Sequence, residues 1–327
     1  MSLYGLHRVM ENENKFPQAA ARLDNSMQPQ ADEVLLDVQM LNIDSSSFRQ
    51  LKAAHNNDEQ KIAAAILDIV QSRGKMHNPV TNSGGMLIGN VIAVGDDIDS
   101  EVKPGDNIAT LVSLTLTPLQ IDEIISVSHN EAQLQVKGKA LLFKDSPFAH
   151  IPADLNHKIV LSALDVCGAP RLMQVHVKQK DEILILGGGT SGILSAIAAL
   201  DKGNTTVTIL EKNAQRIEKI NSLNLPFTVV QCDVSFIKEY IGYANRFNLI
   251  FDCTNIPDVE MTSIICARHD GKILYFNTAT SFTQAALGAE GIGKQVTMII
   301  GNGFYPNHAA YTLDLLRKYP KVQTLLQ

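Results

Sequence analysis

The stretch EILILGGGTSGILSAIAALDKGNTTVTILE, residues 182–211, decides the fold of the C-terminal half. Its apolar start, 182–186, predicts a buried strand, and the glycines after it lead directly into a predicted helix over 191–202. In such a turn Gly187 permits the sharp bend, Gly189 lets the backbone approach a pyrophosphate, and Gly192 lets the helix pack close to the strand. The stretch therefore predicts a strand–turn–helix unit that binds the phosphates of a dinucleotide.

An acid at the end of the next strand supports this interpretation. Glu211 stands where a carboxylate accepts hydrogen bonds from an adenosine ribose, and it favours NAD over NADP, although Lys212 and Arg216 soften that choice. A structural glycine turn beside a solvated acid is the alternative interpretation. We expect the glycine loop and the ends of the strands to supply the cofactor contacts: Gly187, Gly188, Gly189, Thr190, Ser191, Gly192, Glu211, Lys212, Asp233, Cys253, Thr254, Asn277 and Thr278.

The pattern around this stretch indicates an α/β chain of two domains. Six apolar runs separated by helical segments predict a doubly wound parallel sheet: 182–186, 206–210, 227–231, 248–252, 272–276 and 295–300. Before residue 150 the pattern differs, because short strands alternate with glycine and proline turns and predict a small β-barrel-type domain. A chain of 327 residues is long enough for both.

Composition narrows the class of partner. The chain has 28 Lys+Arg against 34 Asp+Glu, a net charge of −6, and this balance argues against a nucleic-acid-binding protein. Its 4 cysteines have no CxxC spacing, which disfavours a disulfide framework, and no apolar run is long enough to span a membrane. We therefore expect a cytoplasmic protein that acts on a small molecule.

A β-rich domain followed by such a sheet resembles the medium-chain dehydrogenase/reductase superfamily, with LIGNVIAVGDDIDSEVKPGDNIA (87–109) as the most similar segment. The resemblance implies a GroES-like domain over 1–152, a Rossmann domain over 153–303, and a C-terminal helix, 304–327, that returns to the first domain. It also implies a homodimer paired through the edge strand QVTMII. Zinc-dependent members carry Cys, Gly-His-Glu and a third ligand where this chain has Asp44, Gly84-Gly85-Met86 and about Ser162. We therefore expect no zinc and no other metal.

A more specific resemblance rests on HRVMENENKFPQAAARLDN (7–25), LNIDSSSF (41–48), RGKMHNPVTNSGGMLIG (73–89) and ATLVSLTLTPLQIDEI (109–124). These strings resemble the L-erythro-3,5-diaminohexanoate dehydrogenase family of bacterial lysine fermentation. Membership implies NAD- or NADP-dependent oxidative deamination of the β-amino group to 5-amino-3-oxohexanoate. The chain departs from the family at Thr190, where we expect a lysine.

This chemistry requires a proton acceptor, a cation for the substrate carboxylate and an acceptor for its second ammonium. We expect Asp44 and His77 to transfer protons or bind ammonium, Ser46 and Ser83 to relay a proton, and Lys75 or Arg8 to bind the carboxylate, with Asn78 as a further contact. A purely structural role for each of these residues is the alternative.

Two other functions stay open at this point. One is a zinc-independent alcohol, carbonyl or quinone reductase of the same superfamily, which needs no cation for a carboxylate. The other is a non-catalytic dinucleotide-binding protein.

Overall fold

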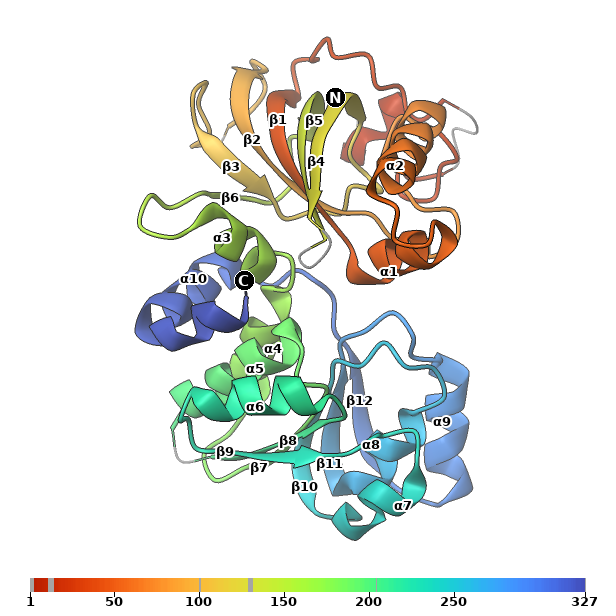
Figure 1. Cartoon of the computed structure of the whole chain (residues 1–327), viewed down its shortest axis with the longest axis vertical. Coiled ribbons are helices and arrows are strands. Elements are labelled where there is room, and N and C mark those ends of the chain that lie inside the picture. Colours follow the sequence, from red (N-terminus) through yellow and green to blue (C-terminus); the bar gives the residue numbers. More distant parts are fainter. Residues whose placement is uncertain (1–2, 11–14, 100, 129–131, 204, 327) are drawn as a thin grey trace. The chain divides into compact units, whose positions relative to one another are not determined.

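A computed structural model describes residues 3–10, 15–99, 101–128, 132–203 and 205–326. The chain forms two compact units, Met1–Asp165 and Val166–Gln327, and each is described by itself (Figure 1). None of the described helices is long and apolar enough to cross a membrane.

The first unit is built on an antiparallel sheet with helices beside it. Its elements are η1 (Leu3–Arg8), β1 (Glu33–Ile43), α1 (Ser45–Ala54), α2 (Glu59–Arg73), β2 (Gly85–Val94), β3 (Asn107–Thr110), β4 (Leu119–Ser128), β5 (Gln133–Phe143), β6 (Phe148–His150) and α3 (His157–Leu164). The strand order is β4-β5-β1-β2-β3-β6. The central strand β1 pairs with β5 on one side and β2 on the other, so its buried residues, among them Leu36, Leu41 and Ile43, form the middle of the core.

Local signals explain where the helices of this unit begin and end. Asp44 caps α1 by accepting a hydrogen bond from the Ser46 amide, and Asp58 caps α2 through Lys61. Gly74 ends α2 in the left-handed conformation at a φ of 65°, which glycine adopts without strain. Helix α1 is not predicted by the sequence pattern, because the run SSSF lacks the apolar period of a helix.

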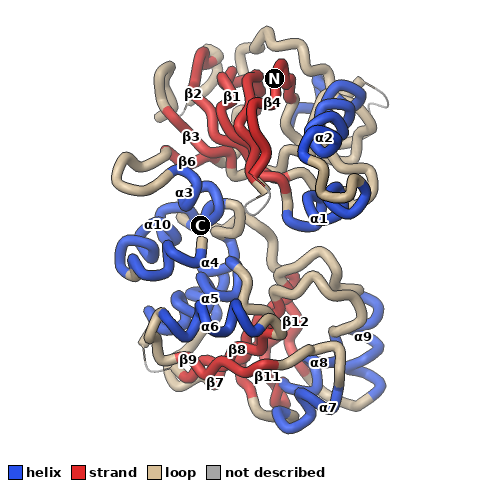
Figure 2. Tube along the Cα trace, in the orientation of Figure 1, coloured by secondary structure: helices blue, strands red, loops and turns tan. Residues whose placement is uncertain are grey.

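The second unit contains the parallel sheet. Its elements are α4 (Gly168–His176), β7 (Glu182–Leu186), α5 (Thr190–Asp201), β8 (Thr206–Glu211), α6 (Ala214–Ser222), β9 (Phe227–Gln231), α7 (Ile237–Tyr240), η2 (Ile241–Tyr243), β10 (Phe247–Asp252), α8 (Glu260–Cys266), β11 (Ala267–Tyr275), α9 (Phe282–Gly291), β12 (Val296–Ile300), α10 (His308–Lys318) and η3 (Pro320–Leu325). Figure 2 shows the strands of this sheet in red. All six predicted strands are present, and the prediction of a doubly wound parallel sheet is confirmed.

The strand order of this sheet determines where a ligand can bind. The order is β12-β11-β10-β7-β8-β9, so the chain runs outward from β7 in one direction and then outward from β10 in the other. Right-handed crossovers place the helices that follow the two halves on opposite faces. The loops after β7 and β10 therefore flank a switch point, where open α/β sheets bind their ligands.

The two compact units divide between Asp165 and Val166, and the expected domain bounds, 1–152 and 153–303, stay a prediction. The last helix, α10, contacts α4 and α5 of its own unit, where Leu313 and Leu316 are buried and the Thr312 hydroxyl donates to the Cys167 carbonyl. A return of residues 304–327 to the first domain stays a prediction.

Candidate functional site

The glycine loop has the shape that a bound phosphate group requires. Gly187 adopts a φ of 92°, and a Cβ on Gly192 would stand 2.0 Å from the Gly187 carbonyl oxygen, so helix and strand meet without room for a side chain. At Gly189 the nearest atom to an added Cβ is Arg216 Nη1, 4.0 Å away. Gly189 precedes Thr190 and Ser191 in the first turn of α5, and no described side chain caps this helix. The loop fits a dinucleotide pyrophosphate on its open side.

Glu211 binds the glycine loop through its carboxylate. Its Oε2 accepts a hydrogen bond from the Gly188 amide at 2.8 Å, and its Oε1 accepts one from the Asn213 amide, also at 2.8 Å. The guanidinium of Arg216 lies on the same loop and donates weakly to the Gly188 carbonyl at 3.4 Å. The acid expected at the ribose is thus held by backbone amides next to the proposed phosphate position.

The remaining predicted cofactor residues at strand ends organise the neighbouring loops. Thr254 donates from its amide and its hydroxyl to Asp252 Oδ1, at 2.9 and 2.7 Å. Burial raises the pKa of Asp252 to about 6, and burial also raises the pKa of the Cys253 thiol. A Cβ on Gly187 would stand 3.2 Å from the Thr254 side chain, so the loops after β7 and β10 are neighbours.

Two more predicted contacts serve local turns. Asn277 Oδ1 accepts hydrogen bonds from the amides of Ala279 and Thr280, and Thr278 donates to Asn255. On the other side of the switch point, Lys212 Nζ lies 3.8 Å from Asp233 Oδ2 in an exposed ion pair. The amide of Ser235 is the main cause that lowers the pKa of Asp233. These contacts leave the predicted cofactor roles of all four residues untested.

In the first unit, Asp44 is the end point of a cluster of hydroxyl groups. Its Oδ1 accepts hydrogen bonds from Ser46 Oγ at 2.5 Å and from Ser83 Oγ at 3.2 Å. Ser83 Oγ lies 2.6 Å from Ser47 Oγ, which in turn lies 2.5 Å from Thr81 Oγ1. The structure thus brings together three residues predicted for the site, Asp44, Ser46 and Ser83, and it adds Ser47 and Thr81. A chain of hydroxyls that ends on a carboxylate is able to pass protons.

The loop that carries Ser83 also holds the other residues predicted for catalysis. Lys75 is fully buried, and its Nζ donates to the carbonyl oxygens of Pro17 at 2.6 Å and Gln18 at 3.1 Å. Burial lowers the pKa of Lys75 to about 8. Asn78 stabilises the turn, because its side chain accepts from the Val80 amide and donates to Gln50.

His77 is a buried imidazole in the same loop. Burial is the main cause that lowers the pKa of His77, and the charges of Lys75 and Arg73 lower it further. Neither ring nitrogen meets the geometry of a hydrogen bond with a described residue, although Asn82 acts on the pKa in the opposite direction. Buried polar atoms normally form hydrogen bonds, and a bound ligand would provide a partner for the ring nitrogens of His77.

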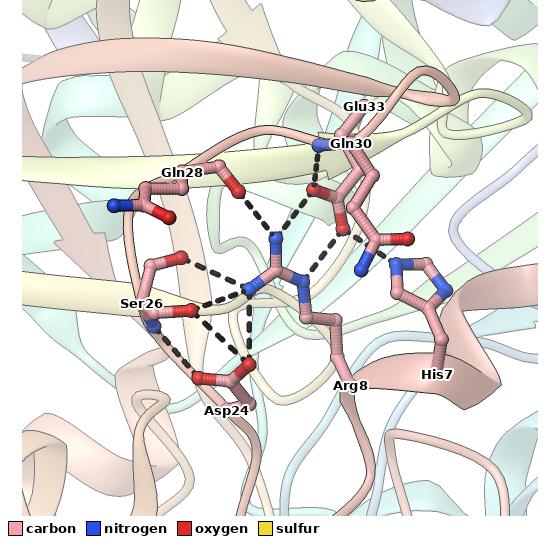
Figure 3. Close-up of polar contacts among 7 residues, drawn as sticks. All are labelled: His7, Arg8, Asp24, Ser26, Gln28, Gln30 and Glu33. Carbon is pink, nitrogen blue, oxygen red and sulfur yellow. Dashed lines mark hydrogen bonds and ion pairs between the residues drawn. The ribbon is translucent and has the colours of Figure 1, made fainter.

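The structure argues against the role expected for Arg8. Figure 3 shows its guanidinium enclosed by acceptors: Nε and Nη2 donate to the two oxygens of Glu33, at 2.8 and 2.6 Å. The other donors contact Asp24, the carbonyl and hydroxyl of Ser26, and the carbonyl of Gln28. Because the five N–H groups of the guanidinium face acceptors of this cluster, Arg8 has no donor left for a substrate carboxylate. Sequence alone did not show that Glu33 is buried beside it.

Sequence reasoning missed Asp165, at the C-terminal end of α3. Burial, together with the neighbouring carboxylate of Asp44, raises the pKa of Asp165 to about 7, while a hydrogen bond with Asn42 acts against this rise. No local motif marks the residue, since it follows an ordinary helical segment. Among the residues that the structure describes, no three His, Cys, Asp or Glu side chains gather closely enough to hold a metal ion.

Comparisons with known proteins connect this geometry to a family. Residues 7–152 match the family model of the L-erythro-3,5-diaminohexanoate dehydrogenase N-terminal domain. The chain is 43% identical to the L-erythro-3,5-diaminohexanoate dehydrogenase of Acetoanaerobium sticklandii over 335 residues, which cover 99% of this chain and 97% of the relative. It is 41% identical to the enzyme of the same name from Fusobacterium nucleatum, over 96% of this chain and 94% of that one.

Solved structures support the predicted fold. A cinnamyl alcohol dehydrogenase from Sorghum bicolor superposes with a TM-score of 0.58 at 13% identity, over 90% of this chain and 83% of that chain. An alcohol dehydrogenase from Thermus sp. ATN1 gives 0.55 at 16% identity, over 93% and 88%. At such identities these likenesses show the fold alone, and they agree with the predicted fold. The similarity to the two curated relatives extends over nearly the whole chain, and we conclude that this chain belongs to the L-erythro-3,5-diaminohexanoate dehydrogenase family.

Proposed function

We propose that the chain oxidatively deaminates L-erythro-3,5-diaminohexanoate to 5-amino-3-oxohexanoate and passes the hydride to NAD. The similarity to two dehydrogenases of this name supports the substrate. The observation that carries the chemistry is the Asp44 carboxylate at the end of the hydroxyl cluster, since amine oxidation has to remove a proton from the substrate ammonium.

We assign the cofactor to the glycine loop of the second unit. The open side of Gly189 and the first turn of α5 would hold the pyrophosphate, and Glu211 would meet the ribose. The bound nicotinamide supplies the hydride acceptor. Because the Glu211 carboxylate would repel a 2′-phosphate, we propose NAD rather than NADP, with Arg216 as the group that weakens the preference.

In the first unit, Asp44 takes the proton that leaves the substrate ammonium, and Ser46 and Ser83 connect it to Ser47 and Thr81. His77 stays neutral and hydrogen-bonds the substrate or the water that attacks the imine. Two cations were expected to bind the substrate carboxylate. Arg8 is no longer a candidate, because its guanidinium donors already bind acceptors of its own cluster. Lys75 stays a proposal, in which one of its ammonium protons reaches the carboxylate while two carbonyls hold the group.

Catalysis without a metal and a cytosolic location also stay proposals. Their support is chemical: Asp44 stands at the place of a zinc-binding Cys in the related dehydrogenases, and the four cysteines are free thiols.

We further propose a homodimer that pairs through β12. This strand is at the edge of its sheet, and Ile300 on it is 71% exposed. The neighbouring helix α9 exposes Phe282 and Leu287 as well. An apolar edge of this kind needs a cover, and a second copy provides one in a closed assembly. Light scattering at micromolar concentration distinguishes dimer from monomer.

The decisive experiment follows NADH and NADPH formation with 3,5-diaminohexanoate, with the wild type and the Asp44→Asn variant. We expect turnover with NAD that falls by about 100-fold in the variant, which is the usual contribution of a general base, while NAD still binds. Activity restricted to simple alcohols, carbonyls or quinones would favour the reductase alternative. Nucleotide binding without any turnover would favour a binding protein.

A further inference from the structure

Helix α3 contacts the start of strand β5, which pairs with the end of strand β1. Asn42 of β1 pairs with Gln133 of β5. The side-chain amide of Gln133 then donates to the Lys158 carbonyl and to Ser162 Oγ, both at 3.1 Å. The register of β1 and β5 thereby fixes where α3 lies within the first unit.

The residue spacings on α3 and β1 indicate that the carboxylates of Asp165 and Asp44 lie on facing sides of these two elements. Ser162 and Asp165 are three residues apart, so they share one face of the helical turn. Asn42 and Asp44 are two residues apart in extended backbone, so they point to the same side of β1. The helix face that Gln133 contacts therefore brings Asp165 to Asn42 and Asp44, in agreement with the hydrogen bond and the charge interaction that act on Asp165.

The charged groups on the surrounding elements do not neutralise this pair. On α3, His157 and Lys158 stand at the opposite end of the helix, and on α1, Arg49 and Lys52 lie beyond its first turn. From β1 and β5 the groups on this side are the amides of Asn42 and Gln133, and the loop that carries Ser83 adds Lys75 and His77. None of these charged or titratable side chains is among the causes that shift the pKa of Asp165. A carboxylate that lies beside a like charge without a cation is harder to ionise, which agrees with the raised pKa of Asp165.

We propose that Asp165 is a positioning residue of the catalytic site, which pairs with Asp44 and makes Asp44 the acceptor for the substrate proton. This inference rests on the proposed function of Asp44. The step is a proton transfer: the N–H bond of the substrate ammonium breaks, an O–H bond forms on Asp44, and the electron pair stays on nitrogen. The charge of the carboxylate pair changes from −2 to −1, and the negative charge of Asp165 favours this change.

The first test is the pH profile of kcat for the wild type, Asp165→Asn and Asp165→Glu. Wild-type kcat should fall as the pH is lowered through about 7, because a protonated pair accepts no further proton readily. In Asp165→Asn this fall should move to lower pH and the plateau should drop by about tenfold, because Asp44 without its neighbour is the weaker base. Asp165→Glu should keep the fall near neutral pH.

A matched control is Asp145→Asn, which removes an exposed carboxylate just after β5 of the same unit. Its profile should equal that of the wild type. A folded, active Asp165→Asn enzyme with the wild-type profile would overturn the proposal.

The second test needs no turnover. Protein labelled with ¹³C at the aspartate carboxyl carbons is titrated by NMR as wild type, Asp44→Asn and Asp165→Asn. We expect one carboxyl that titrates near neutral pH, lost in Asp165→Asn and shifted to lower pH in Asp44→Asn. If Asp44→Asn leaves that titration in place, no pair exists and the inference is wrong. An enzyme inactive on 3,5-diaminohexanoate that shows the coupled titration would refute the proposed function and leave the pair established.

Discussion

The first unit contains two buried charged sites with opposite surroundings: Arg8 lies among opposite charges, and Asp165 lies near a like charge. Around Arg8 every charge has a partner of opposite sign, since Glu33 binds the guanidinium with both oxygens and also accepts from His7 and the Gln30 amide. Burial alone would raise the pKa of Glu33, but these donors hold it below its usual value. At the end of β1, by contrast, Asp165 faces another carboxylate and its pKa is raised.

The difference indicates which group serves stability and which serves chemistry. A saturated ion pair contributes to one fixed conformation and has nothing left for a ligand. A carboxylate beside a like charge destabilises the folded state, and proteins keep such arrangements mainly where they act on a substrate. Arg8, which we expected to bind the substrate, therefore has a structural role. Asp165, which no sequence motif indicated, is the candidate for function.

The largest expected effect comes from breaking the saturated cluster. Arg8→Ala should lower the free energy of unfolding by about 3–5 kcal/mol, because it leaves Glu33 buried without its partner. Urea denaturation followed by circular dichroism measures this loss. The control is Lys137→Ala, which removes the exposed partner of Glu123 and should change stability little. Equal losses in both variants would show that the Arg8 cluster is no stronger than a surface pair.

At the carboxylate pair we expect the opposite effect: removing the charge of Asp165 should raise the free energy of unfolding. Asp165 has a folded-state pKa of about 7 against an unfolded value of 3.8, so the folded state binds more protons between these limits and stability falls as the pH rises through them. Removing the charge with Asp165→Asn should therefore stabilise the protein at pH 8 by up to roughly 4 kcal/mol. Below about pH 4 the difference should vanish, since the carboxyl is neutral in both states.

Denaturation curves of the two proteins at several pH values provide the measurement. A variant that is less stable than the wild type at pH 8 would mean that Asp165 is a structural residue like Arg8.

The smallest effect tests the hydroxyl cluster that joins Asp44 to the loop. Ser47→Ala removes a buried hydroxyl that contacts Ser83 and Thr81, and we expect a loss of about 1 kcal/mol in the free energy of unfolding. Ser72→Ala is the control, because the Ser72 hydroxyl only bonds carbonyls of its own exposed helix surface. Thermal unfolding compares the three proteins, and identical midpoints would remove Ser47 from the cluster.

The sequence predicted those parts of the fold and the site that depend on short segments. The glycine loop, Glu211 and the six parallel strands lie in contiguous patterns, and each is present in the structure. Asp44 and Ser46 are neighbours in the chain, and Ser83 joins them across the sheet because Asp44 pairs with Gly84 through a backbone hydrogen bond. Family resemblance supplied these residues, since no periodicity indicates that this loop reaches Asp44.

The parts that were missed depend on contacts between distant segments. Arg8 looks like a free cation until Glu33, 25 positions later, is seen to be buried beside it. The charge of Asp44 acts on Asp165, and we infer that the register of β1 and β5 and the amide of Gln133 bring the two together, which is not visible in the sequence. Helix α1 was overlooked because its N-cap acid and three serines favour turns as strongly as helix starts.

The two backbone amides on Glu211 limit how this enzyme can be redesigned. Engineers who convert coenzyme preference usually exchange the acid at this position for a small or basic residue. Here the exchange would also release the amides of Gly188 and Asn213, so the loop would lose two of the hydrogen bonds that hold it. A successful conversion would need a replacement acceptor for Gly188, and Arg216, already beside that residue, would be the natural group to recruit for a new phosphate.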